Sequence, residues 1–188
     1  MKKLGRNRKA LSAPVTTMIL LVVPVMLTGG TVMYAYQIIS NETQLEILRL
    51  YNQHIWIYGN GTSFAAIVID NAGGRDALID KIEVRGVESP WTTVHYLKTS
   101  SPIPATLNCP NATNHSWAAF QYTENVTAAF AVANADIPLA SGNTLIIFMK
   151  NPANIAPADI GKTIGITVFT MNAHCYLECN VQSADTAP

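Results

Sequence analysis

The chain has 188 residues, of which 49% are hydrophobic and only 13% are charged, and its 12 basic and 12 acidic residues cancel at neutral pH. So sparse a charge argues against the clustered basic surface that nucleic-acid binding needs, and the length suits one domain beyond a terminal segment. Five of the basic residues precede residue 10, so the remainder holds seven basic against 12 acidic side chains, a net charge of about minus 5.

A basic stretch, residues 1–9, runs directly into an apolar segment. An ordinary secretory signal peptide places a small-residue cleavage site after its apolar core, but the residues found there, Tyr34-Ala35-Tyr36-Gln37, form a poor A-x-A site. The convincing small residue is Ala10, which follows the basic pair Arg8-Lys9 and precedes the apolar run. We therefore expect cleavage after Ala10, which removes residues 1–10 as a leader and leaves the apolar segment at the new N-terminus.

The junction Lys9-Ala10-Leu11-Ser12 resembles the class III signal peptide of archaeal type IV pilins and archaellins. In that family a basic residue and Ala or Gly precede the cut, and an apolar and a small residue follow it. The resemblance implies that a prepilin-peptidase-like membrane protease processes the chain at Lys9, Ala10 and Leu11, and that the mature protein assembles into a surface filament. Val15 stands at the fifth mature position, where bacterial type IV pilins usually carry Glu, so the archaeal branch is favoured.

Residues 11–41 carry no charged side chain over a stretch of 31 residues. As a helix this stretch is about 46 Å long at roughly 1.5 Å per residue, which exceeds the ~30 Å hydrocarbon core of a bilayer. The excess fits a helix that also packs along identical copies in a filament, where neighbours tolerate breaks at Pro24 and Gly29-Gly30. A plain membrane anchor fits the hydropathy equally well. We expect a hydrophobic helix over residues 11–50, in the membrane before assembly and in the filament core afterwards.

The basic leader also predicts orientation. Because all five of its basic residues precede the apolar run, the positive-inside rule keeps the leader in the cytoplasm and places everything after Ile39 outside. The precursor is expected in the cell membrane and the mature protein in an extracellular cell-surface filament.

Residues 51–188 are expected to form one extracellular domain of short β-rich runs separated by turn residues. Apolar and polar side chains alternate in residues 79–85 and 164–170, as in half-buried strands. Several short strands at this spacing predict an antiparallel, immunoglobulin-like β-sandwich. The predicted fold class is therefore α+β, with a long N-terminal hydrophobic α-helix followed by an all-β sandwich head domain.

Two parts of this domain are similar to archaellin and archaeal pilin head domains. One is the strand-turn-strand pattern of residues 67–86, and the other is Asp159-Ile160-Gly161-Lys162 running into a strand. Where the helix meets the sandwich, Leu45, Leu48 and Tyr51 fit a helical face. The change is expected between residues 40 and 54.

Five N-x-[ST] sequons follow the apolar run, where composition alone predicts about two. They are candidate N-glycosylation sites, strongest at Asn60 and Asn111, which lie in turn-like contexts; alternatively, Asn and Thr merely supply an uncharged polar surface. The candidate acceptors are Asn41, Asn60, Asn111, Asn114 and Asn125.

Cys109, Cys175 and Cys179 fall in the predicted extracellular part, where disulfides persist. If Cys175 and Cys179 share one extended strand, they are about 13 Å apart by strand rise, too far for a bridge. A disulfide from Cys109 to one of the two is therefore the expected bond. A metal site at His174-Cys175-x-x-x-Cys179 lacks a second ligand pair at a recognised spacing.

No catalytic, cofactor-binding or metal-binding residues are expected, and the protein is not expected to be an enzyme. Asp159-Ile160-Gly161-Lys162-Thr163 ends like a phosphate loop, but Ala156 replaces the first glycine of that motif, so a turn into a strand is the preferred interpretation. Asp76, Asp80 and Glu83 cluster near a turn; they can bind Ca²⁺ or form a solvated hairpin edge.

These patterns predict a pilin, the structural subunit of an archaeal type IV adhesive pilus that serves surface attachment and cell-cell contact. The expected partners are identical subunits, the prepilin peptidase and pilus assembly machinery, and the membrane before assembly, with no nucleic acid. One alternative is an archaellin, the same architecture in a motility filament. Another is a membrane-anchored extracellular binding module that never polymerises.

Overall fold

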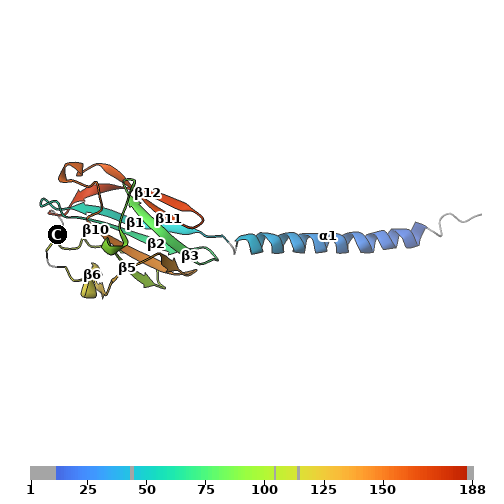
Figure 1. Ribbon diagram of the computed structural model, residues 1–188. Helices are drawn as coiled ribbons and strands as arrows, with labels where there is room; N and C mark the ends of the chain where they lie inside the picture. The colour runs from blue at the N-terminus through green and yellow to red at the C-terminus, as the bar shows by residue number, and fades with distance from the viewer. Residues whose placement is uncertain (1–11, 43–44, 104, 114, 186–188) are drawn as a thin grey trace, which may run out of the picture. The chain divides into compact units, whose positions relative to one another are not determined.

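The structure, a computed structural model, describes residues 12–42, 45–103, 105–113 and 115–185, and it divides into two compact units, residues 1–43 and 44–188. The first unit contains the long helix α1 (Ser12–Glu42) and the second is a β-sheet domain (Figure 1). The predicted α+β class, with a hydrophobic helix ahead of a β-domain, is confirmed.

The junction between helix and β-domain falls earlier than the predicted boundary at residue 50. Helix α1 ends at Glu42, and the first strand, β1 (Leu48–Ile57), already begins at Leu48. Residues 48–51 pair in register with residues 68–71 of β2 (Ser63–Asn71), so the sheet satisfies their backbone groups. Leu48 and Tyr51 therefore belong to a strand and not to a helical face. The change of structure does lie within residues 40–54, as expected.

One half of the sheet has the hydrogen-bonded order β1, β2, β10, β5, β8, and each of these pairings is antiparallel. Strands β2 and β10 lie in its interior and are buried along almost their whole length. This explains why residues 64–69 and 145–149 are unbroken apolar runs and do not alternate. The other bounds are β10 (Thr144–Lys150), β5 (Val94–Thr99) and β8 (Ala131–Val132).

The second half has the order β4, β3, β11, β12, with β9 beside β3, and it is also antiparallel throughout. Its strands are β4 (Val87–Glu88), β3 (Ala77–Val84), β11 (Thr163–Thr170), β12 (His174–Ser183) and β9 (Ile137–Leu139). Strand β12 joins β1 in parallel, with residues 55–57 opposite residues 181–183, and this seam makes one sheet of 10 strands. Such a parallel pair is an addition to the predicted antiparallel pattern.

The two halves share the main apolar core. Ile55, Ile67 and Ile147 enter it from β1, β2 and β10, and Ile82 and Ile166 enter it from β3 and β11. All five side chains are fully buried. Burial of an aliphatic side chain of this size contributes about 1.5–3 kcal/mol, so this core is the principal source of stability in the β-domain.

A second core, rich in aromatic side chains, lies on the opposite face of the same strands. Trp56, Phe64 and Phe148 alternate along β1, β2 and β10 with the residues of the main core, so they face the other way. Phe120 and Phe130 of the segment between β5 and β9 cover them, with ring centroids 5.2 and 5.3 Å from that of Phe148. This segment contains η2 (Trp117–Ala119), β6 (Phe120–Thr123) and β7 (Val126–Ala128); the other 3-10 helices are η1 (Trp91–Thr93) and η3 (Pro157–Asp159).

Asp159, at the end of η3, has a buried carboxylate that forms ion pairs with two basic side chains. Its Oδ1 lies 2.8 Å from Nζ of Lys162, and its Oδ2 lies 3.1 Å from Nη1 of Arg85. The hydrogen bond from Lys162, followed by that from the backbone N–H of Ala156, holds the pKa of Asp159 below its usual value. Arg85 and Gly86 form the turn between β3 and β4, so Asp159 ties this turn to the turn into β11. A turn into a strand is what residues 159–163 predicted.

Gly73, between β2 and β3, lies against the chain that leads into β1. A Cβ atom on Gly73 would lie 2.4 Å from the carbonyl oxygen of Leu45 and 2.6 Å from the backbone nitrogen of Ile47. The N–H of Ala72 donates to the carbonyl oxygen of Ile47 at 2.9 Å, which holds the two segments together. Only glycine allows the backbones to approach this closely.

Candidate functional site

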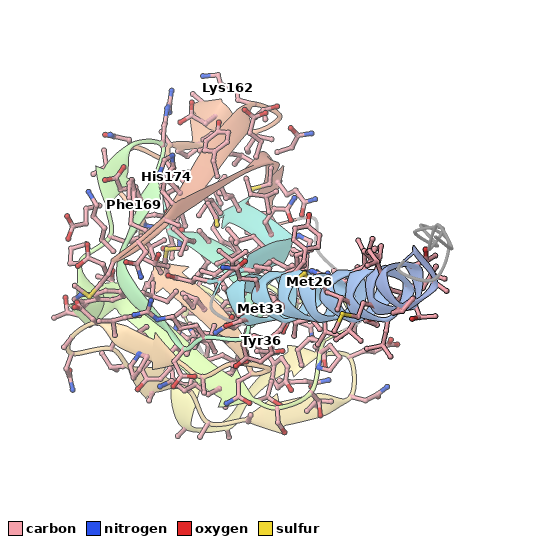
Figure 2. All side chains as sticks on the ribbon, turned by 90° about the vertical axis from the view of Figure 1, so that its right-hand side faces the viewer. Met26, Met33, Tyr36, Lys162, Phe169 and His174 are labelled. Atoms are coloured by element: carbon pink, nitrogen blue, oxygen red, sulfur yellow. The ribbon has the colours of Figure 1, made fainter. Side chains whose placement is uncertain are left out.

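Helix α1 exposes apolar side chains on every side. All residues from 13 to 39 are exposed, including Met26 at 73% and Met33 at 77%. Figure 2 shows Met26, Met33 and Tyr36 on the helix. The segment Ala13–Ser40 contains an 18-residue window with a mean hydropathy of 2.0, so the helix is long and apolar enough to cross a membrane. A helix that is apolar all round requires an apolar environment.

Three threonine hydroxyl groups in α1 donate to its own backbone. Thr17 donates to the carbonyl oxygens of Ala13 and Pro14 at 3.1 and 2.9 Å, and Thr31 donates to that of Thr28 at 2.9 Å. Thr28 likewise donates to the carbonyl oxygen of Pro24. Because these polar groups need no water, they do not make a hydrophilic stripe on the helix.

A recess lies in the surface of α1 at Gly30. A shallow hollow of about 460 Å³ is lined by Gly30 together with Met33, Tyr34, Tyr36 and Gln37. A Cβ atom added to Gly29 or Gly30 would meet nothing within 4 Å, so nothing in the described helix requires glycine here. Glycine in a helix interior costs about 1 kcal/mol relative to alanine. Close approach of another helix is the usual compensation.

The predicted processing residues Lys9, Ala10 and Leu11 lie outside the described residues. Cleavage between Ala10 and Leu11 therefore stays a prediction.

The strongest sequons lie in exposed turns. Asn60 follows β1, and its Oδ1 accepts a hydrogen bond from the N–H of Thr62 at 2.9 Å. Asn111 makes the same turn, with its Oδ1 3.0 Å from the backbone nitrogen of Thr113. Asn125 is exposed in the turn between β6 and β7. The side chain of Asn41, in the last turn of α1, and the whole of Asn114 lie outside the described residues.

The predicted disulfide from Cys109 is wrong for this structure, in which Cys109, Cys175 and Cys179 are all free. Cys109 packs against the aromatic core, whereas Cys179 packs against the main core, and the β1–β2–β10 half of the sheet separates the two cores. Cys175 and Cys179 share strand β12, the arrangement that rules out a bridge between them. Burial raises the pKa of Cys109 and of Cys179 to about 11, which leaves both as unreactive thiols.

The residues considered for metal binding are not brought together. His174 is exposed and pairs with Phe169, whereas Cys175 pairs with the inward-facing Val168, so His174 and Cys175 lie on opposite faces of β12. Within the described ranges, no group of three or more His, Cys, Asp or Glu side chains is placed to hold a metal ion. Asp76 instead accepts a hydrogen bond from the N–H of Ser141 at 2.9 Å.

A cavity of about 640 Å³ lies at the end of β1, and the sequence analysis did not identify it. Its nine lining residues come from four separate stretches of the chain, at residues 56–58, 107–111, 121 and 184–185. Because no short motif connects these stretches, only the fold brings them together. The aromatic residues near its first stretch, Trp56 and Tyr58, are the one local signal that sequence inspection offers.

No protein-family model matches the chain, and no curated protein matches it. Its function must therefore be inferred from the apolar helix, the β-domain and the cavity.

Proposed function

We propose that this protein is a pilin, the structural subunit of an archaeal type IV adhesive pilus, which polymerises through α1 into an extracellular filament. The observation that carries the proposal is the all-round exposure of apolar side chains on α1. Identical helices packed side by side would cover that surface. The junction Lys9-Ala10-Leu11, which would leave the helix at the mature N-terminus, supports the same conclusion.

Two details of the helix favour a polymer over a simple anchor. At roughly 1.5 Å per residue, its 31 residues extend for about 46 Å, more than the ~30 Å that a bilayer core requires. The recess at Gly30 suits close contact with another helix, whereas lipid chains gain nothing from glycine at this place. A membrane-anchored binding module would need neither feature.

The β-domain supports an adhesive role outside the cell. Its exposed turns carry Asn60, Asn111 and Asn125, which are uncharged hydrogen-bonding groups and candidate glycan acceptors. Contacts between such groups and a surface are individually weak. Repetition along a filament would combine them through effective concentration and give avidity that a single subunit lacks.

Deletion of the protein, with complementation by the wild type, tests this function. We expect surface filaments to disappear from electron micrographs and attachment to surfaces and cells to fall, while swimming is unchanged. The major protein of purified filaments should begin at Leu11 by N-terminal sequencing and intact mass. Loss of swimming with attachment preserved would identify an archaellin, and a protein that is exported without any filament would identify an anchored binding module.

A further inference from the structure

The cavity at the end of β1 has an apolar floor and a polar rim. Trp56, Leu107 and Ala184 line it while remaining only 3–5% exposed. The rim consists of polar side chains, namely Asn108, Asn111, Gln121 and Asp185. Its volume of about 640 Å³ lies within the ~300–1,000 Å³ that is usual for small-molecule sites.

The two aromatic residues that line the cavity, Trp56 and Tyr58, are held in fixed positions. The indole of Trp56 stacks on His54, with ring centroids 4.9 Å apart and planes 9° from parallel. The hydroxyl of Tyr58 donates to the carbonyl oxygen of Pro110 at 2.9 Å. Burial, together with the contact to Cys109, raises the pKa of Tyr58 to about 12, so the phenol stays neutral. A preorganised wall reduces the entropy lost when a ligand binds.

The rim offers several hydrogen-bond acceptors to a ligand. The amide groups of Asn108 and Gln121 donate to the carbonyl oxygens of Gln121 and Glu124, at 3.1 and 2.5 Å. Asp185 accepts from the N–H of Gly59 through Oδ2 at 2.7 Å. Oδ1 of Asn108, Oε1 of Gln121 and Oδ1 of Asp185 are not the atoms used in these bonds, so they are the rim oxygens that can accept from a ligand. Such a rim suits a ligand that brings several donors.

The charges around the cavity restrict that ligand further. None of its nine lining residues is Lys, Arg or His, so a phosphate or carboxylate ligand would find no counter-charge. Asp185 is its only carboxylate, which is too few oxygen ligands of full charge for a metal ion. Cys109 remains a thiol, because its pKa is raised to about 11. An uncharged, hydroxyl-rich molecule with one apolar face meets all of these conditions.

We propose that this cavity binds a neutral sugar, either a free hexopyranose or the terminal unit of a glycan. The C–H face of the sugar ring would lie on the apolar floor at Trp56, and its hydroxyl groups would donate to Asn108, Gln121 and Asp185. This inference goes beyond the filament function, since a single subunit suffices for binding.

Binding is tested with the full mature chain, produced in a host without N-glycosylation and kept in a polyoxyethylene detergent. Maltoside and glucoside detergents are avoided because their headgroups would compete. The probes are neutral methyl pyranosides and disaccharides, with sialic acid and inorganic phosphate for comparison. We expect saturation-transfer NMR signals from ring C–H protons of at least one neutral sugar and none from sialic acid. Absence of any neutral ligand, or preference for an anionic one, would overturn the proposal.

Variants locate the binding site. Gln121→Ala removes one acceptor, and Asp185→Asn removes a charge while keeping an oxygen for the N–H of Gly59. Each should weaken the affinity about tenfold, as expected for the loss of one good hydrogen bond to the ligand. Asp80→Asn, an exposed carboxylate on β3 away from the cavity lining, is the matched control and should leave affinity unchanged. Unchanged affinity in both rim variants would place binding elsewhere and reject the cavity.

The sugar can come from another cell or from the glycans of the protein itself, because Asn111 is both a rim residue and a candidate acceptor. Native filaments distinguish the two sources. If they bind added sugar as well as the unglycosylated chain does, the natural ligand is external. If they bind only after Asn111→Gln, a glycan on Asn111 occupies the cavity. Failure of both forms to bind refutes the proposal, without bearing on whether filaments assemble.

Discussion

The helix and the β-domain contain the same kinds of apolar side chain, but these are exposed in the helix and buried in the β-domain. In α1, Leu21 and Met26 are 69% and 73% exposed, whereas in β10 both Ile147 and Phe148 are fully buried. The β-domain fills two cores with its own residues, while the described helix has no core of its own. Apolar content alone therefore does not show whether a segment buries its apolar side chains within its own chain. Changes in the helix should alter what the chain associates with, and changes in the β-domain should alter whether it folds.

Val25→Asp in α1 should have the largest effect, the loss of filament assembly. Val25 is 65% exposed on α1, and a charge at mid-helix costs about 2.5–3.5 kcal/mol per subunit on membrane-insertion scales. We expect no filaments by electron microscopy, because every subunit would carry the same uncompensated charge. The control is Val126→Asp in β7, where Val126 is 45% exposed and the charge meets water. Normal filaments from Val25→Asp would show that the helices are not the core.

Phe148→Ala should destabilise the β-domain without any change in the helix. Phe148 is fully buried among the aromatic rings of the second core, and truncation of a buried Phe lowers the free energy of unfolding by about 3–5 kcal/mol. Urea titration followed by tryptophan fluorescence measures the loss. Met26→Ala removes a side chain of similar size from α1 and should change the stability of the β-domain by less than about 0.5 kcal/mol. Equal losses from the two variants would contradict the comparison.

Gly73→Ala and Gly30→Ala test the same contrast with one methyl group. At Gly73 the new Cβ meets backbone atoms of Leu45 and Ile47, so we expect the unfolding free energy to fall by about 1–3 kcal/mol. At Gly30 the new Cβ meets nothing within 4 Å, so the β-domain should keep its stability. Filament yield should instead fall, because the recess on α1 is filled. A stable Gly73→Ala variant would mean that residues 45–47 can move away.

The smallest expected effect concerns pH. The hydrogen bond from Lys162 lowers the pKa of Asp159 in the folded protein from the ordinary aspartate value of 3.8. Its ion pairs therefore stabilise the fold above that value, and the stabilisation is lost as the pH falls through the folded pKa. Asp159→Asn should therefore have a lower urea midpoint than the wild type at pH 7, and the difference should shrink below about pH 3.8. Asp80→Asn, which removes an exposed carboxylate, is the control for the loss of one negative charge. A pH-independent difference for Asp159→Asn would mean that its packing, and not its charge, matters.

The sequence was sufficient where structure depends on local patterns. An uncharged run of 31 residues predicted α1, because such a run permits only an apolar helix at this length. Alternation predicted β3 and β11, and the residues before Thr163 predicted a turn. The end of α1 was misplaced because the spacing of Leu45, Leu48 and Tyr51 fits a helical face. Pairing with β2 instead puts Leu48 and Tyr51 in a strand, where they face opposite cores.

Features that depend on tertiary contacts were not predictable. The aromatic core requires Phe120 and Phe130 to fold over the outer face of β2 and β10, and no periodicity in their own segment indicates that. The cysteine pairing failed because spacing does not say on which side of a sheet Cys109 will lie. The cavity combines residues more than a hundred positions apart, such as Trp56 and Asp185.

The place of β1 in the sheet has a mechanical consequence. This strand follows the helix in the chain, so tension transmitted along the chain from α1 reaches the β-domain at Leu48. It is paired with β2 along most of its length and with β12 at residues 55–57, so its second half is an interior part of the sheet. A pull along its axis loads its hydrogen bonds to both neighbours in shear, so that many must break together. The residues of β1 nearest the helix are paired with β2 alone, whereas residues 55–57 are paired on both sides, so the far end of the strand is the more firmly anchored.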